Sequence, residues 1–321
     1  MMCCYYPTTT VAIDDDTDFL GILTQHLGIT DCIPYSSPKK AIATLRSQRP
    51  FKRIQSRVLK ATTAHENNKS PEDHAVRFNL HGLHEEIYNK DRFQDVSVII
   101  VDYHMGDVSG IDVCEALTNH PAKKILLTGG TDKETIAIEA FNKGIIHRFI
   151  NKSDVNFPIK LKQAISVLKE AYFRDLSSSV LPKSVDFHPS LVNFSRSIQD
   201  QHEAIEYYML DPLGSTLMLD ASGEAAWIVI EHKSDMMNLE VLANDQEAPG
   251  HLIQDIANGS IMPFFFSEND YQTDASEWEK ICYPAQALPG VKDYYYATWK
   301  GHKNHIDQSK IVSYNSTKII K

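Results

Sequence analysis

Apolar runs alternate with segments of helical periodicity through the first half of the chain. The runs lie at residues 9–13, 31–35, 96–101, 125–127 and 145–150, and apolar positions three or four apart follow each of them. The run at 96–101 is β-branched and apolar on both faces, as is typical of a central strand in a covered parallel sheet. The pattern therefore predicts a five-stranded, parallel, doubly wound α/β sheet.

The pattern changes after residue 176. A serine-rich stretch at 177–179, followed by Pro182, is typical of a linker, and helical spacing resumes from Ser190 to Glu206. Six strands are expected beyond it, at residues 206–210, 215–219, 225–230, 261–266, 292–299 and 311–314. Two short helices, around 236–243 and 251–257, separate the third strand from the fourth. Turn sequences join the first three strands, so we expect an α+β domain with an antiparallel meander.

These patterns predict a first domain at 1–176, a linker at 177–189 and a second domain at 190–321. The first domain is longer than one sheet of this kind needs, which places an insertion at about 46–95. The start of the insertion is basic, since Arg46, Lys52, Arg53 and Arg57 occur with no acidic residue between them. Such a run is either the solvated face of a helix or a patch for an acidic partner or nucleic acid.

Charge differs sharply between the two halves. The formal net charge of the 321-residue chain is −10, with 22 basic and 22 acidic residues in 1–176 but 10 basic and 20 acidic residues in 177–321. Nucleic-acid binding relies on Lys and Arg that displace counterions from phosphates, so the second half is a poor candidate for it. If the protein binds nucleic acid, we expect the contacts to come from the basic insertion or from a dimer surface.

The composition also predicts where the protein resides. No apolar run approaches the roughly 18 residues that a membrane span needs. The start of the chain also lacks the basic segment followed by an apolar segment that is typical of a secretion signal. Five cysteines without metal-ligand spacing fit a reducing compartment. We therefore expect a cytoplasmic protein with no membrane association, and an exposed, frayed end at Cys3 and Cys4.

Polar groups gather at the ends of four predicted strands. An acidic trio at 14–16 follows the first strand, Asp102 follows the third, Thr128 ends the fourth and Lys152 follows the fifth. Functional groups of a doubly wound sheet collect at this edge, and adjacent carboxylates favour a hard divalent cation such as Mg²⁺. Asp102 is then placed to attack a phosphoryl group, with Lys152 and Thr128 stabilising its oxygens. The pattern predicts an aspartyl phosphate.

The residues around these positions resemble the receiver domain of two-component response regulators. The resemblance lies in VAIDDD (11–16), VDYHMGDVSG (101–110), LTG (127–129) and FINK (149–152), in order and at fitting spacing apart from the insertion. It covers about the first 175 residues and implies a flavodoxin-like fold. The whole chain is more loosely similar to quorum-sensing response regulators of the α-hydroxyketone signalling type, on the order of its parts and on a stretch at 207–214.

The resemblance assigns a role to each site residue. It implies Asp102 as phosphoacceptor and as a metal ligand, together with the acidic pair Asp14 and Asp15 and the backbone carbonyl of His104. It also implies Lys152 as the phosphate-binding lysine, and Thr128 and Phe149 as the positions that shift on phosphorylation. The chain departs from the family at Ser153 and Gly106, where receivers usually have proline, and at Phe149, which lacks a tyrosine hydroxyl. A cis bond before Ser153 cannot be assumed.

The sequence thus predicts a response regulator phosphorylated on Asp102, with Mg²⁺, by a sensor histidine kinase. The only enzymatic activity expected is phosphoryl transfer to and from its own aspartate. Because catalytic motifs are missing and the second half is acidic, we expect an output through a homodimer or a bound protein. Two alternatives stay open, a phosphorylation-controlled nucleic-acid-binding regulator and an output domain with nucleotidyltransferase-like activity.

Overall fold

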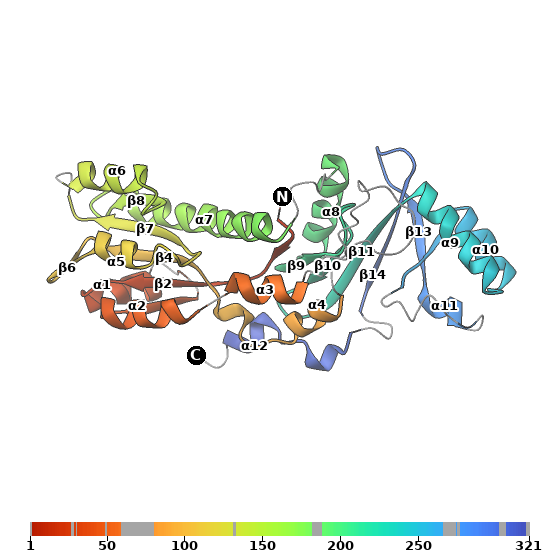
Figure 1. Cartoon of the computed structure of the whole chain (residues 1–321), viewed down its shortest axis with the longest axis horizontal. Helices are drawn as coiled ribbons and strands as arrows, with labels where there is room; N and C mark the ends of the chain where they lie inside the picture. Colours follow the sequence, from red (N-terminus) through yellow and green to blue (C-terminus); the bar gives the residue numbers. More distant parts are fainter. Residues whose placement is uncertain are drawn as a thin grey trace. The chain divides into compact units, whose positions relative to one another are not determined.

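The computed structural model describes residues 2–26, 29, 31–48, 50–58, 80–130, 133–181, 188–265, 274, 277–301 and 306–318 (Figure 1). The chain divides into two compact units that are both discontinuous in sequence. Unit 1 consists of residues 1–2, 7–53 and 91–179, and unit 2 of residues 3–6, 54–90 and 180–321. The first half of the chain therefore supplies residues to both units.

Unit 1 is built on a parallel sheet of five strands, as predicted. The strands are β2 (Thr9–Ile13), β3 (Cys32–Tyr35), β4 (Val96–Asp102), β7 (Lys123–Thr128) and β8 (Arg148–Asn151). Their order is β3-β2-β4-β7-β8, and every neighbouring pair is parallel. This doubly wound order is that of flavodoxin-like folds. All residues of β2, β4 and β7 are buried, because helices cover both faces of the sheet.

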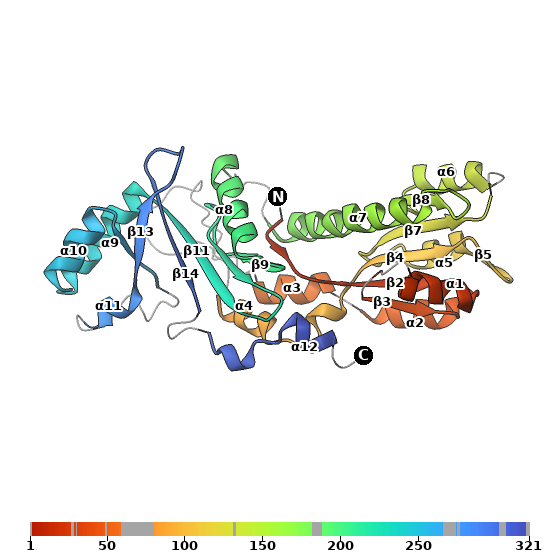
Figure 2. The same ribbon diagram turned by 180° about the vertical axis from the view of Figure 1, so that it is seen from behind.

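Helices cover the two faces of this sheet in two groups. They are α1 (Thr17–Gly21), η1 (Ile22–His26, a π-helix), α2 (Pro38–Ser47), α5 (Gly110–Ala116), α6 (Glu134–Asn142) and α7 (Phe157–Val180), with a 3₁₀ turn η2 (Arg92–Gln94) before β4 and a small hairpin of β5 (His104–Met105) and β6 (Val108–Ser109) after it. One core cluster joins the sheet to α2, α5 and α6. A second joins its other face to α1, η1 and α7 (Figure 2).

The serine-rich stretch at 177–179 is helical, so the prediction that a linker begins there is wrong. The hydroxyls of Ser177, Ser178 and Ser179 donate to the carbonyls of Phe173 (2.7 Å), Arg174 (2.9 Å) and Leu176 (2.7 Å). Each hydroxyl bonds to a carbonyl one turn back in its own helix, a contact that helices tolerate, and α7 continues to Val180. Residues 182–187 of the predicted linker lie outside the described part of the chain.

Unit 2 is built on an antiparallel sheet of seven strands. They are β1 (Cys4–Tyr5), β9 (Glu206–Met209), β10 (Thr216–Leu219), β11 (Ala225–His232), β12 (Ile261–Pro263), β13 (Cys282–Ala287) and β14 (Tyr294–Lys300). Their order is β1-β9-β10-β11-β14-β13-β12. The predicted meander is present as β9, β10 and β11. A core cluster on Val229 and Trp278 joins the sheet to α9 (Lys233–Asp245), α10 (Gly250–Ala257) and α11 (Trp278–Ile281).

The expectation of a frayed N-terminus is wrong. Cys3 and Cys4 are fully buried, Cys4 lies opposite Tyr208 in the ladder, and the Met209 N–H donates to the Cys3 carbonyl at 2.8 Å. The rings of Tyr5 and Tyr207 stack with centroids 6.0 Å apart. The short N-terminal segment is ordered because it completes the edge of a sheet formed by distant residues.

The C-terminal segment also differs from its prediction. Residues 311–313 are not a strand, and α12 (Tyr314–Lys318) follows them. Here Gln308 Nε2 donates to the Gly223 carbonyl at 2.6 Å and the Asn315 N–H to the Ala221 carbonyl at 3.0 Å. The segment thus packs against the turn between β10 and β11 instead of entering the sheet.

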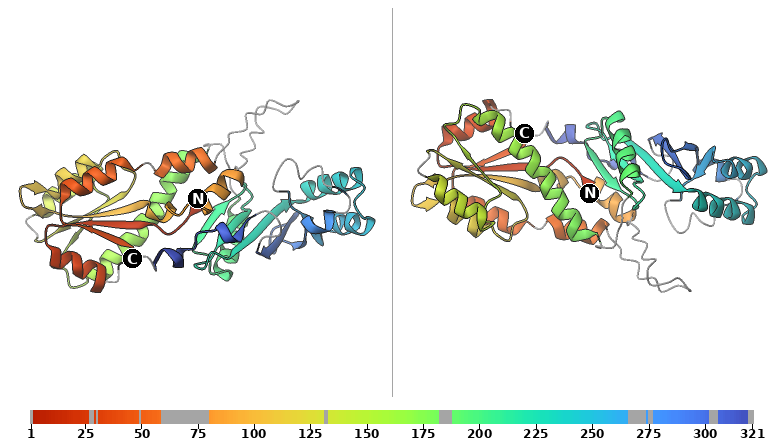
Figure 3. Two further views of the ribbon diagram at one scale, coloured as in Figure 1. Left: turned by 90° about the horizontal axis from the view of Figure 1, so that it is seen from below. Right: turned by 90° about the horizontal axis from the view of Figure 1, so that it is seen from above.

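The remaining helices complete the two units. They are α3 (Pro50–Val58), which crosses the division at residue 53, and α4 (Leu80–Ile87), α8 (Pro189–Gln201) and the 3₁₀ turn η6 (Gln308–Lys310) in unit 2. In the described part of the chain, no helix combines the length and the apolar character needed to cross a membrane. Figure 3 gives two further views of these elements.

Candidate functional site

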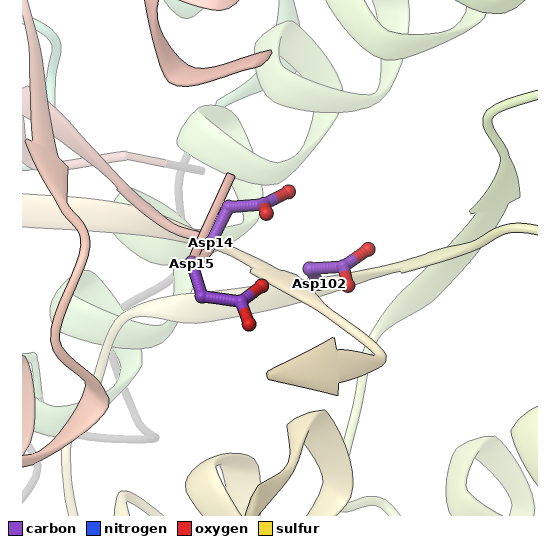
Figure 4. A group of neighbouring side chains, drawn as sticks. All are labelled: Asp14, Asp15 and Asp102. Atoms are coloured by element: carbon purple, nitrogen blue, oxygen red, sulfur yellow. The ribbon is translucent and has the colours of Figure 1, made fainter. Parts of the chain in front are cut away.

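Three carboxylates meet at one edge of the parallel sheet. Asp14 and Asp15 follow β2 directly, and Asp102 is the last residue of β4. Each offers a ligand oxygen within 4.8 Å of the others, with Asp14 and Asp102 buried and Asp15 exposed (Figure 4). Since β2 and β4 are parallel neighbours with Ile13 opposite Val101, the residues that follow them must lie side by side. The structure thus brings together the acidic residues selected from the sequence.

The third aspartate of the trio has a structural task. Asp16 caps α1, because its side chain accepts from the N–H groups of Asp18 (2.9 Å) and Phe19 (3.0 Å). Its own N–H donates to Asp14 Oδ1 at 2.9 Å. The start of α1 therefore fixes the orientation of the Asp14 carboxylate, which leaves Asp14 and Asp15 as the acidic pair.

The backbone lies close to Asp102 at two points, the peptide of His104 and the start of α5. The His104 N–H donates to Asp102 Oδ2 at 2.8 Å, which places the peptide of His104 at the site. At Gly110, a Cβ atom would lie 2.1 Å from the Asp102 carbonyl oxygen, closer than any real contact. Only glycine allows α5 to begin this near the end of β4. Gly110 is therefore a site residue, although it has no functional side chain that would have marked it as one in the sequence.

Lys152 joins the two buried carboxylates. Its ammonium group lies 2.8 Å from Asp14 Oδ2 and 2.7 Å from Asp102 Oδ1, and 3.9 Å from the centroid of the Phe19 ring. The backbone N–H of Lys152 donates to the Thr128 carbonyl at 2.8 Å, which anchors the residue directly after β8. The sequence analysis did not predict the contact with Phe19. An aromatic residue in the first turn of the helix that follows the acidic trio is the sequence feature that could have indicated it.

Burial and charge act in opposite directions on these groups. Burial raises the pKa of Asp14, although hydrogen bonds from Lys152 and the Asp16 N–H lower it in part. For Lys152, burial alone would lower the pKa, but hydrogen bonds and attraction to Asp102 and Asp14 outweigh it and the pKa is raised. Lys152 is therefore a cation, and it offsets part of the repulsion among three carboxylates.

Thr128 and Phe149 lie on the two strands beyond Asp102. Thr128 ends β7 with no exposed surface, and its hydroxyl oxygen has no hydrogen-bond partner among the residues that the structure describes. A buried hydroxyl is rarely left so, and a ligand oxygen would satisfy it. Phe149, in β8, is half-buried and packs on the core cluster beneath α5 and α6. The bond between Lys152 and Ser153 is not cis.

The side chains at this edge suit a hard cation. Carboxylate and carbonyl oxygens are the ligands that Mg²⁺ prefers, and the exposed position of Asp15 leaves room for the waters that it retains. Three carboxylates against one ammonium leave a net charge of about −2, which a divalent ion would balance. The arrangement combines an anchored carboxylate, a candidate cation site, an ammonium group and a hydroxyl donor.

Comparison with solved structures gives a match that extends over nearly the whole chain. The response regulator LqsR of Legionella pneumophila is 27% identical, with a TM-score of 0.73 over 99% of this chain and 95% of LqsR. The chain therefore resembles a response regulator along its entire length, and unit 1 has the receiver-domain fold. Neither models of protein families nor curated protein sequences give a match.

Partial matches cover about half of the chain. An adenylate cyclase from Rhodopirellula baltica is 20% identical, with a TM-score of 0.37 over 54% of this chain and 95% of the other. The response regulator TrrA of Thermotoga maritima, in complex with Mg²⁺ and BeF, is 14% identical, with a TM-score of 0.31 over 50% and 98%. TM-scores this low support no inference about function.

Proposed function

We propose that this protein is a two-component response regulator whose Asp102 accepts a phosphoryl group, with Mg²⁺, from the phosphohistidine of a sensor kinase. The observation that carries the proposal is the position of Asp102, whose carboxylate lies beside both the Lys152 ammonium and the acidic pair at the edge of the sheet. In this proposal unit 1 is the receiver domain, unit 2 is the output domain and the protein is cytoplasmic.

The side chains of unit 1 divide the proposed reaction among them. An oxygen of the Asp102 carboxylate attacks the phosphorus atom, the bond to the kinase imidazole breaks, and the electron pair of that bond returns to the imidazole nitrogen. Asp14, Asp15 and the His104 carbonyl would hold Mg²⁺, which neutralises phosphoryl oxygens when bound. Lys152, already next to Asp102, moves its ammonium group to a phosphoryl oxygen. Water later hydrolyses the acyl phosphate.

Thr128 connects this chemistry to a conformational change. Its hydroxyl donates to a phosphoryl oxygen on Asp102, which gives that buried group the partner it otherwise lacks among the described residues. Movement of Thr128 shifts the end of β7, and the half-buried Phe149 ring on β8 repacks beside it. The result is a shift of population between two packings of unit 1, which the last receiver helix, α7, passes on.

A homodimer or a bound protein is the output that we propose. The acidic excess in residues 177–321 opposes direct binding to a phosphate backbone. Within the basic run, Arg53 already pairs with Asp95, which removes it from a free cationic patch. A role in quorum sensing rests on the resemblance to the α-hydroxyketone type of regulator.

Mass spectrometry after incubation with acetyl phosphate and Mg²⁺ tests phosphorylation. The wild-type chain should carry the phosphoryl group on Asp102, and Asp102→Asn should carry none on that peptide. Asp107→Asn, in an exposed turn of the same loop, is the matched control and should be phosphorylated normally. Wild-type levels of phosphate on the same peptide of Asp102→Asn would show that the assignment is wrong.

Each output has its own test. Sedimentation of the phosphorylated and unphosphorylated full chain should show a change in dimerisation, or pull-down should recover a partner that depends on phosphorylation. Nucleic-acid binding predicts a gel shift that weakens with salt and with Arg57→Ala. A nucleotidyltransferase needs clustered carboxylates, and in the described part of unit 2 no three acidic, His or Cys side chains form a metal-binding group. That alternative rests on the sequence alone.

A further inference from the structure

The ring of Phe19 covers one side of the ammonium group of Lys152. The Lys152 Nζ atom lies 3.9 Å from the centroid of that ring, well within the distance over which a cation is attracted to an aromatic face. The same atom lies 2.8 Å from Asp14 Oδ2 and 2.7 Å from Asp102 Oδ1. An ammonium group has three hydrogens, so two can serve the carboxylates while the third is directed to the ring. The ammonium is therefore held by contacts of two different kinds.

The backbone does not by itself determine where this ammonium lies. The backbone N–H of Lys152 donates to the Thr128 carbonyl at 2.8 Å, and that of Ser153 donates to Asn151 Oδ1 at 2.8 Å, so the main chain here is fixed. The lysine side chain, however, is a flexible stem of four carbons. Ser153 does not restrict the residue before it as a proline would. The position of the ammonium therefore depends on the contacts that its own side chain makes.

The ring of Phe19 is held from two sides. Asp16, which caps α1, accepts from the Phe19 N–H at 3.0 Å, so the residue is fixed in the first turn of the helix. The centroid of its ring lies 6.1 Å from that of Phe157, the first residue of α7, which is 7% exposed. Phe157 belongs to the core cluster beneath α7, and Phe19 packs against that cluster. The ring thus offers the ammonium a fixed surface.

Phosphoryl transfer would change one kind of contact and leave the other. Once an oxygen of Asp102 is bonded to phosphorus, the carboxylate has lost its charge, and the negative oxygens lie on the phosphoryl group. The ammonium then has to turn from Asp102 towards one of them. The ring takes no part in the reaction, and its attraction for a cation does not depend on which hydrogen faces it. Lys152 can therefore turn without leaving the ring of Phe19.

We propose that Phe19 is a positioning residue for phosphoryl transfer, an inference that rests on the proposed function. Its ring holds the Lys152 ammonium beside Asp102 before the reaction and keeps it there while the ammonium exchanges the carboxylate for a phosphoryl oxygen. This role needs the negative face of an aromatic ring, which an aliphatic side chain of similar size lacks.

The rate of phosphorylation by acetyl phosphate and Mg²⁺, followed on the full chain by intact mass spectrometry, tests this role. Phe19→Leu keeps an apolar side chain but removes the ring, and it should slow the reaction about tenfold. Phe19→Tyr restores an aromatic face and should react within about twofold of the wild-type rate. The matched control is Leu20→Ala, which removes buried packing from the same helix but leaves the ring in place, and it should also react at close to the wild-type rate. Near-UV circular dichroism confirms that each variant is folded.

Nuclear magnetic resonance of isotope-labelled lysine tests the contact without phosphorylation. The ring current of Phe19 should shift the ε-methylene protons of Lys152 upfield, Phe19→Leu should abolish that shift, and Lys152→Met identifies the resonance. An unshifted Lys152 resonance in the wild type, a wild-type rate in folded Phe19→Leu, or a Phe19→Tyr rate as low as that of Phe19→Leu would overturn this inference alone. A wild-type chain that is not phosphorylated on Asp102 would overturn the proposed function together with it.

Discussion

Replacement of Lys152 by methionine exposes the repulsion that its ammonium group offsets. The change keeps an unbranched side chain that is one heavy atom shorter and uncharged, and it leaves the buried carboxylates of Asp14 and Asp102 facing each other within 4.8 Å. Two unit charges at that distance repel by about 3.5 kcal/mol at an effective dielectric constant of about 20. We expect Lys152→Met to lower the free energy of unfolding of unit 1 by about 3 kcal/mol at pH 7.5 in EDTA.

The pH dependence of this loss has a definite sign. Burial already raises the pKa of Asp14, and removal of Lys152 takes away a hydrogen bond that lowers it. A carboxyl whose pKa is higher in the folded state contributes stability at low pH that is lost as the pH rises through the folded pKa. The difference between Lys152→Met and wild type should therefore shrink as the pH falls from 7.5 towards 4, and Mg²⁺ should shrink it at pH 7.5.

Hydrogen exchange of peptides from β2 and β4, followed in urea by mass spectrometry, measures this free energy for unit 1 separately. The matched control is Lys160→Met, because Lys160 lies in the exposed first turn of α7 and pairs with Asp154 just before it, so its loss should leave the stability nearly unchanged. Wild-type stability of Lys152→Met in EDTA, or a loss that neither acid nor Mg²⁺ reduces, would refute the electrostatic argument.

Three further predictions address packing, pH and the N-terminus. Gly110→Ala should destabilise unit 1 by about 1–3 kcal/mol in the same exchange assay, because its Cβ would overlap the Asp102 carbonyl. Burial, with the nearby charge of Lys123 and Lys124, lowers the pKa of His147 to about 4, so wild-type stability should fall by up to about 3 kcal/mol as the pH drops from 6.5 to 4, and His147→Asn should flatten that fall. Deletion of residues 2–6 removes β1 and should expose β9 to fast exchange, at a cost of about 3 kcal/mol or more.

Controls are available for each of these. Gly21→Ala, with no atom within 4 Å of the added Cβ, should be neutral or stabilising. Equal stability of Gly110→Ala and Gly21→Ala would mean that the loop after β4 has spare room. An unchanged acid profile in His147→Asn would assign the loss to other groups. Unchanged exchange of β9 after the deletion would show that the N-terminal strand does not protect it.

Hydrophobic pattern and the residues at strand ends are enough to predict the parallel half of the protein and the residues of its candidate site. Strands buried on both faces are almost continuously apolar, as β4 is apart from Ser97 and its last residue, Asp102, and the helices between them show a clear helical period. Parallel strands also end at one edge, so the sequence alone places Asp14 and Asp102 together although they are 88 positions apart. The roles of these residues stay predictions, since geometry alone does not show phosphoryl transfer.

Which distant segments share a sheet depends on long-range pairing and not on local pattern. Residues 4 and 5 carry too little pattern to predict a strand, and they form β1 because β9, some 200 residues later, presents its edge. The strand β13 contains Pro284 and small or polar residues, and it exists because it pairs with both β12 and β14. Strand pairing is a long-range interaction whose hydrogen bonds do not depend on side-chain identity, so the local sequence does not encode the partner. Helical periodicity is local, which is why the sequence determined the helices of unit 1 more fully than the sheet of unit 2.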